Sequence, residues 1–117
     1  MTEAPLIAWL ENLTVKDVPL VGGKNASLGE MIQKLKSKGI RVPGGFATTA
    51  PAYWSFVEHN GLEQKISELI KIYQKDEKKL PQVGKSIRQL FLRGKFPEAL
   101  EQELCQAYRK LCRREKR

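Results

Sequence analysis

The sequence has few of the side chains that bind metals or form disulfides, with one histidine and two cysteines in 117 residues. Because His59 stands alone and the chain has no Cys-x-x-Cys pair, the sequence assembles no tetrahedral zinc site. Cys105 and Cys112 are seven positions apart in a helical pattern, which separates them by ~10 Å along the axis, too far for a disulfide. We expect both thiols to be small core residues in a reducing compartment.

Long apolar runs are also missing. No run approaches the ~20 residues that a bilayer-spanning helix needs. The first residues, MTEAPLIAWLENL, carry an acid in place of the basic flank of a signal peptide. Since 41% of the residues are hydrophobic and 29% are charged, the composition allows a core and argues against disorder throughout. We therefore expect one compact, soluble, cytoplasmic unit without a membrane partner.

The net charge of +8 is concentrated at one end of the chain. Residues 109–117, RKLCRREKR, contribute +5 and leave only +3 for the first 108 residues. This pattern favours a solvated helix end, stabilised by the negative end of the helix dipole, over a nucleic-acid-binding patch. Nonspecific nucleic-acid binding through this run stays an alternative, and it would weaken steeply with salt.

The hydrophobic spacing predicts a helix-dominated α+β fold with about five helices and two short strands. The strands are expected at residues 6–10, around Trp9, and at residues 46–49. The helices begin near Asn25, after Thr49, at Leu62, after Pro81 and at Pro97. Two strands this short do not make a stable sheet by themselves. Either the helices cover the pair, or further strands are missing from the chain.

Several local signals refine these elements. Residues 11–23 have no clear period and are expected to be irregular, and KDEKK at residues 75–79 is expected to be a polar connection. Ser27 and Glu30 have capping-box spacing for the first helix, with Asn25 as a competing cap. Thr49 is expected to cap the second helix. The last helix is expected to turn five side chains inward: Leu100, Leu104, Ala107, Tyr108 and Leu111.

Two glycines and a lysine stand directly before the first long helix, as Gly22, Gly23 and Lys24. The free N–H groups of a helix N-terminus carry partial positive charge, glycines allow close approach to the backbone, and a lysine adds a full charge. This arrangement suits a phosphate group. It is not a P-loop, because Asn25 and Ala26 follow the lysine. An ordinary turn with a solvated lysine remains open on this local pattern.

The runs VGGKNASLGEM (residues 21–31) and VPGGFATTAPAYWSF (residues 42–56) resemble the opening of the phosphoenolpyruvate synthases, the pyruvate, water dikinases. Pyruvate, phosphate dikinases and rifampicin phosphotransferases share a looser form of the first run. The resemblance covers nearly the whole chain. It implies that residues 1–117 are the N-terminal part of an ATP-grasp nucleotide-binding domain, in which Lys24 contacts the ATP phosphates and Gly22 and Gly23 form a supporting loop.

The same resemblance implies an enzyme that converts ATP, pyruvate and water into AMP, phosphoenolpyruvate and phosphate through a phosphohistidine. The Mg²⁺ ligands, the phosphohistidine domain and the domain that binds phosphoenolpyruvate and pyruvate would lie outside this chain. His59 does not match the family's phosphorylated histidine, and Arg41 and Arg88 are not distinguished from surface arginines. We therefore expect the chain by itself to be inactive, and expect the remainder of a dikinase or a partner chain to supply the rest.

An alternative keeps the fold and changes the role. The chain would then be a stand-alone, truncated helical protein that binds partners, or further copies of itself, through apolar surface left uncovered by the missing strands.

Overall fold

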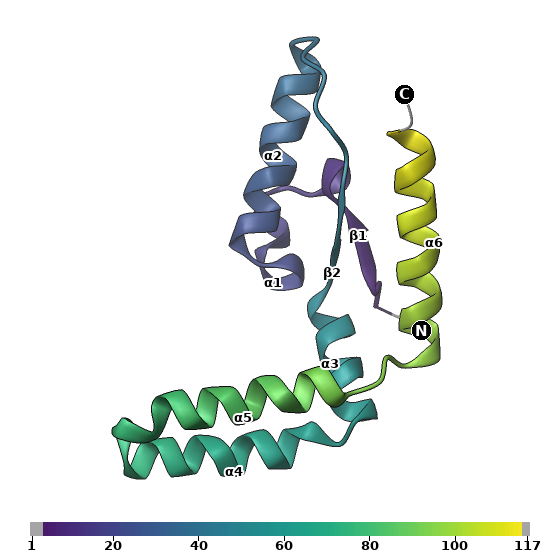
Figure 1. Ribbon diagram of the computed structural model, residues 1–117. Helices are drawn as coiled ribbons and strands as arrows, with labels where there is room; N and C mark the ends of the chain where they lie inside the picture. Colours follow the sequence, from purple (N-terminus) through teal and green to yellow (C-terminus); the bar gives the residue numbers. More distant parts are fainter. Residues whose placement is uncertain (1–3, 116–117) are drawn as a thin grey trace. The chain divides into compact units, whose positions relative to one another are not determined.

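The computed structural model describes residues 4–115, which contain six α-helices, short 3-10 turns and one two-stranded sheet (Figure 1). The helix-dominated α+β class is thus confirmed. The chain divides into two compact units where the sequence predicts one: unit 1 comprises residues 1–53 and 98–117, and unit 2 comprises residues 54–97. Among the described residues, no helix is both long and apolar enough to cross a membrane.

The sheet of unit 1 pairs β1 (Ile7–Trp9) with β2 (Phe46–Thr48) in antiparallel register. Both strands were predicted, and both are shorter than the sequence suggests. Trp9 stands opposite Phe46, and their ring centroids are 5.5 Å apart. Backbone hydrogen bonds between two three-residue strands are not enough for a stable sheet. The packing of this aromatic pair adds to its stability.

Helix α2 (Gly23–Ser37) packs closely against the turn η1 (Leu10–Asn12) that follows β1. The contact depends on Gly29, because a Cβ atom at this position would lie 2.6 Å from the Leu13 carbonyl oxygen and 2.7 Å from that of Leu10. One turn further along, the Gln33 side-chain amide donates to the carbonyl oxygens of Glu11 and Leu13, at 3.0 and 2.7 Å. The absence of a side chain at residue 29 therefore sets the distance between α2 and the chain before it.

The expectation of irregular structure at residues 11–23 is wrong. Beyond η1, these residues form a second 3-10 turn, η2 (Val15–Asp17), and a one-turn helix, α1 (Val18–Val21). Thr14 caps η2: its side chain accepts from the Lys16 N–H, while the Asp17 carboxylate accepts from the Thr14 N–H at 2.9 Å. Capping bonds within four residues carry no hydrophobic period, so the periodicity that predicts helices does not detect them.

The predicted caps of α2 are also wrong. The helix begins at Gly23 with Gly22 as its N-cap, and no side chain caps it. Glu30, which the capping-box spacing assigns to the helix terminus, accepts instead from the Val15 N–H at 3.1 Å. The Glu30 carboxylate thus bonds to η2 in a tertiary contact and does not cap the start of α2.

Helix α3 (Ala50–His59) is capped as predicted. Thr49 is buried, and its hydroxyl accepts from the Ala52 N–H at 3.2 Å while donating to the Pro5 carbonyl oxygen at 2.6 Å. The same hydroxyl therefore begins the helix and holds the segment before β1. His59 is exposed in the last turn of α3.

Unit 2 is built on a hairpin of two strongly amphipathic helices, α4 (Leu62–Lys75) and α5 (Leu80–Arg93), which pack against each other. The predicted polar connection is shorter than expected, because Lys75 still belongs to α4 and residues 77–79 form the 3-10 turn η3. At the other end of the hairpin, Phe56 contacts Phe91 and Phe96 with ring centroids 5.7 and 5.6 Å apart.

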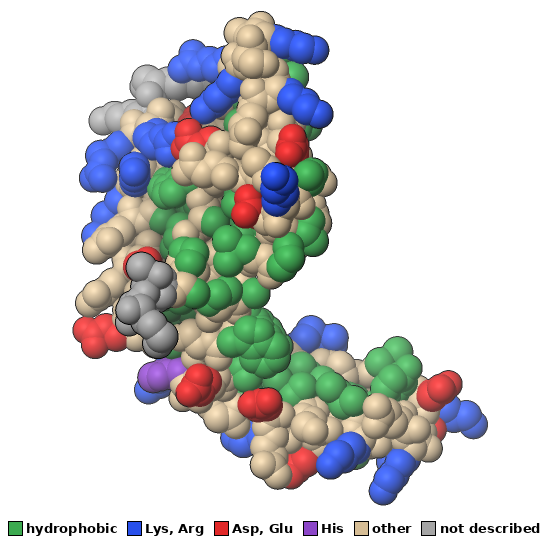
Figure 2. Space-filling view, turned by 180° about the vertical axis from the view of Figure 1, so that it is seen from behind, with side chains coloured by type: hydrophobic (Ala, Val, Ile, Leu, Met, Phe, Trp, Pro, Cys, Tyr) green, Lys and Arg blue, Asp and Glu red, His purple; other side chains and the backbone are tan. Residues whose placement is uncertain are grey.

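Two helices bury only part of their apolar faces. Leu62 of α4 and Val83 of α5 are buried, whereas Leu92 of α5 is 83% exposed. Figure 2 shows green hydrophobic side chains along the hairpin, with charged side chains beside them. Further large apolar side chains of this hairpin are exposed, namely Ile70, Ile72 and Leu80.

Helix α6 (Glu98–Arg114) returns to unit 1 and contacts β1. Leu100 and Ala107 are buried as predicted, but Tyr108 is 63% exposed and both cysteines are exposed, so the core positions predicted for these three residues are wrong. Cys105, Tyr108 and Cys112 share a stripe rotated by roughly 100° from the buried one. Because α6 packs on only one side, that neighbouring stripe stays outside the core.

The basic end of α6 makes more tertiary contacts than a solvated helix end would. Arg114 pairs with the Glu11 carboxylate and lies over the Trp9 ring at 4.9 Å, and Lys110 lies over the same ring at 5.4 Å. Glu11 also pairs with Lys36 of α2 at 3.4 Å. These charges therefore connect α6 to the turn after β1 and to α2. The last two residues of the basic run lie outside the described residues.

We predict that Gly29→Ala destabilises the chain, since the new methyl group must displace backbone oxygen atoms. We expect the free energy of unfolding to fall by about 1–3 kcal/mol, as for overpacked positions, measured by urea denaturation followed by circular dichroism. The matched control is Gly84→Ala in α5, where a Cβ would meet only the flexible end of Arg88 at 3.3 Å. That variant should be neutral or stabilising, because alanine has the higher helix propensity. Equal losses in both variants would contradict the close packing at residue 29.

We predict that the contribution of Glu11 to stability is lost in acid. The hydrogen bond from Arg114, with further contributions from Lys36, holds the pKa of Glu11 below its ordinary value of 4.5. A carboxylate whose pKa is lower in the folded state stabilises above its unfolded pKa and loses that contribution as the pH falls through the folded value. The unfolding free energies of wild type and Glu11→Gln should therefore differ at neutral pH and converge below pH 4.5. A difference independent of pH would argue against this ion pair.

Candidate functional site

Gly22, Gly23 and Lys24 form a sharp corner between α1 and α2. Gly22 has φ +86° and ψ 163°, a backbone region that is essentially restricted to glycine. Its N–H donates to the Val18 carbonyl oxygen at 2.8 Å, and its own carbonyl oxygen accepts from the Ala26 N–H at 3.1 Å. One residue thus closes the last turn of α1 and opens the first turn of α2.

The first turn of α2 presents N–H groups that no side chain caps. Gly22 and Gly23 are exposed, and nothing lies within 4 Å of the position of a Cβ atom at either residue, so the chain has open space beside this backbone. Lys24 is exposed, and it makes no ion pair with any residue in the range 4–115. Partial positive charge from the helix end and a free ammonium group therefore stand at one open corner, which suits an anionic group such as a phosphate.

Asn25 belongs to this corner in a way that the sequence did not reveal. Its side-chain amide donates to the Val21 carbonyl oxygen at 2.9 Å, across Gly22. The sequence suggested Asn25 as a cap for the N–H groups of α2, but it caps the C-terminal end of α1. An amide side chain four residues after the end of a short helix can indicate this role. That indication is usable only when the end of α1 is known, and the sequence did not predict α1.

The other cations and hydroxyls considered from the sequence lie elsewhere. Arg41 and Arg88 are exposed, and Arg88 belongs to α5 in unit 2. Thr49 has the structural role already described. Thr48 is exposed at the end of β2.

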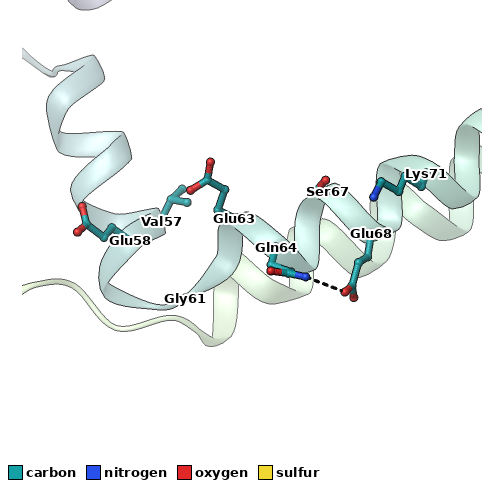
Figure 3. Close-up of a pocket in the computed structure, with 8 residues that line it drawn as sticks. All are labelled: Val57, Glu58, Gly61, Glu63, Gln64, Ser67, Glu68 and Lys71. Atoms are coloured by element: carbon teal, nitrogen blue, oxygen red, sulfur yellow. Dashed lines mark hydrogen bonds between the residues drawn. The ribbon is translucent and has the colours of Figure 1, made fainter.

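A shallow hollow of about 620 Å³ lies in unit 2, along α4 (Figure 3). Figure 3 shows three carboxylates around it, from Glu58, Glu63 and Glu68, and the Gln64 amide donates to Glu68 at 3.5 Å. Its remaining lining comes from Val57, Gly61, Ser67 and Lys71. No residue of the predicted phosphate site lines this hollow. Across residues 4–115 there is no group of three or more His, Cys, Asp or Glu side chains that could hold a metal ion.

The fold and the corner together define a helix-dominated α+β unit in which the N-terminus of α2 is exposed and uncapped. Residues 18–117 match the family described as pyruvate phosphate dikinase, AMP/ATP-binding domain. The chain belongs to this family. The match includes α1, the glycine corner and all of α2, so the corner is part of the region that defines the family.

The chain is also similar to phosphoenolpyruvate synthases of several bacteria. It is 55% identical to that of Neisseria meningitidis over 106 residues, 90% of this chain and 13% of the relative. It is 48% identical to that of Synechocystis over 113 residues, 96% of this chain and 14% of the relative. With that of Escherichia coli it shares 44% over 109 residues, 92% of this chain and 14% of the relative. The chain therefore spans about one seventh of the length of these relatives.

We predict that the two glycines of the corner respond differently to substitution. Gly22→Ala forces alanine to positive φ, and the unfolding free energy should fall by about 1–3 kcal/mol. Gly23→Ala has ordinary φ and open space, so stability should be unchanged or rise by about 0.4–1 kcal/mol through the unfolded state. Thermal unfolding of both variants, followed by circular dichroism, measures the difference. Similar behaviour of the two variants would contradict the conformation of Gly22.

Proposed function

We propose that this chain is the N-terminal ATP-binding segment of a phosphoenolpyruvate synthase-like enzyme. Lys24 contacts the ATP phosphates, and Gly22 and Gly23 provide the supporting loop at the start of α2. The observation that carries the proposal is the open, uncapped N-terminus of α2 with Lys24 beside it, inside a region that matches an AMP/ATP-binding domain family. The proposal includes a cytoplasmic location, where ATP is available to such a site.

The physical role of Lys24 follows from charge. A positioned ammonium group lowers the cost of holding anionic phosphates together and stabilises charge on a transferring phosphoryl group. In the complete enzyme, ATP would phosphorylate a histidine, and the phosphohistidine would pass its phosphoryl group to pyruvate. Carboxylates outside this chain would hold Mg²⁺, which would supply further positive charge to the phosphates. Because one lysine supplies neither the metal ligands nor a phosphoacceptor, the chain by itself binds nucleotide without turnover of pyruvate.

A second candidate function is association through apolar surface. The exposed apolar side chains of the α4–α5 hairpin favour it, since isolated amphipathic helices usually cover such faces. Sedimentation of the chain over a range of concentrations tests it, and a monomer at every concentration would exclude self-association. Nonspecific nucleic-acid binding is less favoured, because Lys110 and Arg114 of the basic run are engaged by Trp9 and Glu11.

We predict that Lys24→Ala weakens ATP binding by about 10- to 100-fold, the loss typical of a charged hydrogen bond. Isothermal titration of the 117-residue chain with Mg-ATP measures the affinity. The control is Lys34→Ala, which removes an exposed lysine near the other end of the same helix and should leave affinity unchanged. Equal losses in the two variants would reduce the role of Lys24 to net charge, and no ATP binding by the wild type would contradict the proposal.

A further inference from the structure

We propose that Asn25 is a positioning residue of the phosphate site: its side-chain amide holds the Gly22–Gly23–Lys24 corner in the shape that receives the phosphates. The inference rests on the proposed function and extends it to a residue that need not touch the nucleotide. It is carried by the hydrogen bond from the Asn25 side chain to the Val21 carbonyl oxygen, at 2.9 Å.

The hydrogen bond from Asn25 matters because few other hydrogen bonds hold the backbone of the corner. Helix α1 has only four residues, and Gly22 is the most permissive residue type in the backbone. The contacts on its two sides are the Gly22 N–H to Val18 and the Ala26 N–H to the Gly22 carbonyl oxygen. Neither contact bridges directly from α1 to α2. The Asn25 amide does so, because it starts in the first turn of α2 and ends on the last residue of α1.

Burial distinguishes Asn25 from its neighbours. Val21 is buried in the core of unit 1 and Ala26 is fully buried, so the two ends of the corner are anchored. Asn25 is half-buried between them, whereas Gly23 and Lys24 are exposed. The side chain therefore ties the exposed, phosphate-facing residues to the buried framework. Holding the donors in place before binding lowers the ordering cost that the nucleotide must otherwise overcome.

The test compares three variants of the 117-residue chain. Asn25→Ala removes the donor, and since alanine has the higher helix propensity, α2 itself does not melt. Asn25→Gln keeps a side-chain amide donor on a stem one methylene longer. Ser27→Ala is the matched control, as it removes an exposed polar side chain from the same helix.

Two readouts separate positioning from contact. The first is hydrogen exchange of the Gly22 and Ala26 N–H groups without nucleotide. We expect it to accelerate roughly 3- to 10-fold in Asn25→Ala, the equivalent of one neutral hydrogen bond, and to return toward wild type in Asn25→Gln. The second is the affinity for Mg-ATP by titration, which should follow the same order. Ser27→Ala should match the wild type in both readouts.

Unchanged exchange in Asn25→Ala would overturn the positioning role, even with weaker ATP binding, because a residue that only contacts the nucleotide leaves the free corner unchanged. Faster exchange with unchanged affinity would overturn it as well. Wild-type chain that binds no ATP would remove the proposed function and this inference together. Loss of ATP binding in Lys24→Ala with a neutral Asn25→Ala would remove the inference alone.

Discussion

The structure of unit 1 depends on one close approach, that of α2 to the backbone of residues 10–13 across Gly29. A side chain there would meet two carbonyl oxygens at 2.6 and 2.7 Å, so only glycine permits this distance. At this distance the Gln33 amide reaches two backbone carbonyls and the Glu30 carboxylate reaches the Val15 N–H. These bonds fix the path of the chain into α1, and thereby the direction from which it enters the glycine corner.

Ion pairs and cation–π contacts hold the other elements of unit 1 together. Glu11 receives Lys36 from α2 and Arg114 from α6, and Trp9 lies under both Lys110 and Arg114. The last helix is thereby joined to the first strand although about a hundred residues separate them. These interactions explain why a basic run that resembles a binding patch in sequence contributes to packing. In unit 2, the two helices of the hairpin leave several apolar side chains exposed.

In the proposed function, the corner that this packing supports connects the fold to ATP binding. Gly22 supplies a conformation that other residues reach only with strain, Gly23 leaves the first turn open, and Lys24 adds a charge. The match to a pyruvate phosphate dikinase AMP/ATP-binding domain includes this corner. Phosphate recognition by backbone N–H groups requires few specific residues, so the run at residues 22–24 suggests it only weakly by itself. The match to a nucleotide-binding domain family supports it further.

The sequence by itself determined the elements whose signals are local. The periodic helices, the two strands and the cap at Thr49 were all recognisable, because each depends on neighbours within a turn or two. The phosphate site at residues 22–24 is a prediction from the same kind of local signal. Tertiary structure alone decided that Glu30 bonds to η2, that Asn25 caps α1, and that Cys105 and Cys112 lie outside the core. Each of these outcomes depends on which side of a helix meets another segment, and that is set by contacts between residues far apart in the chain.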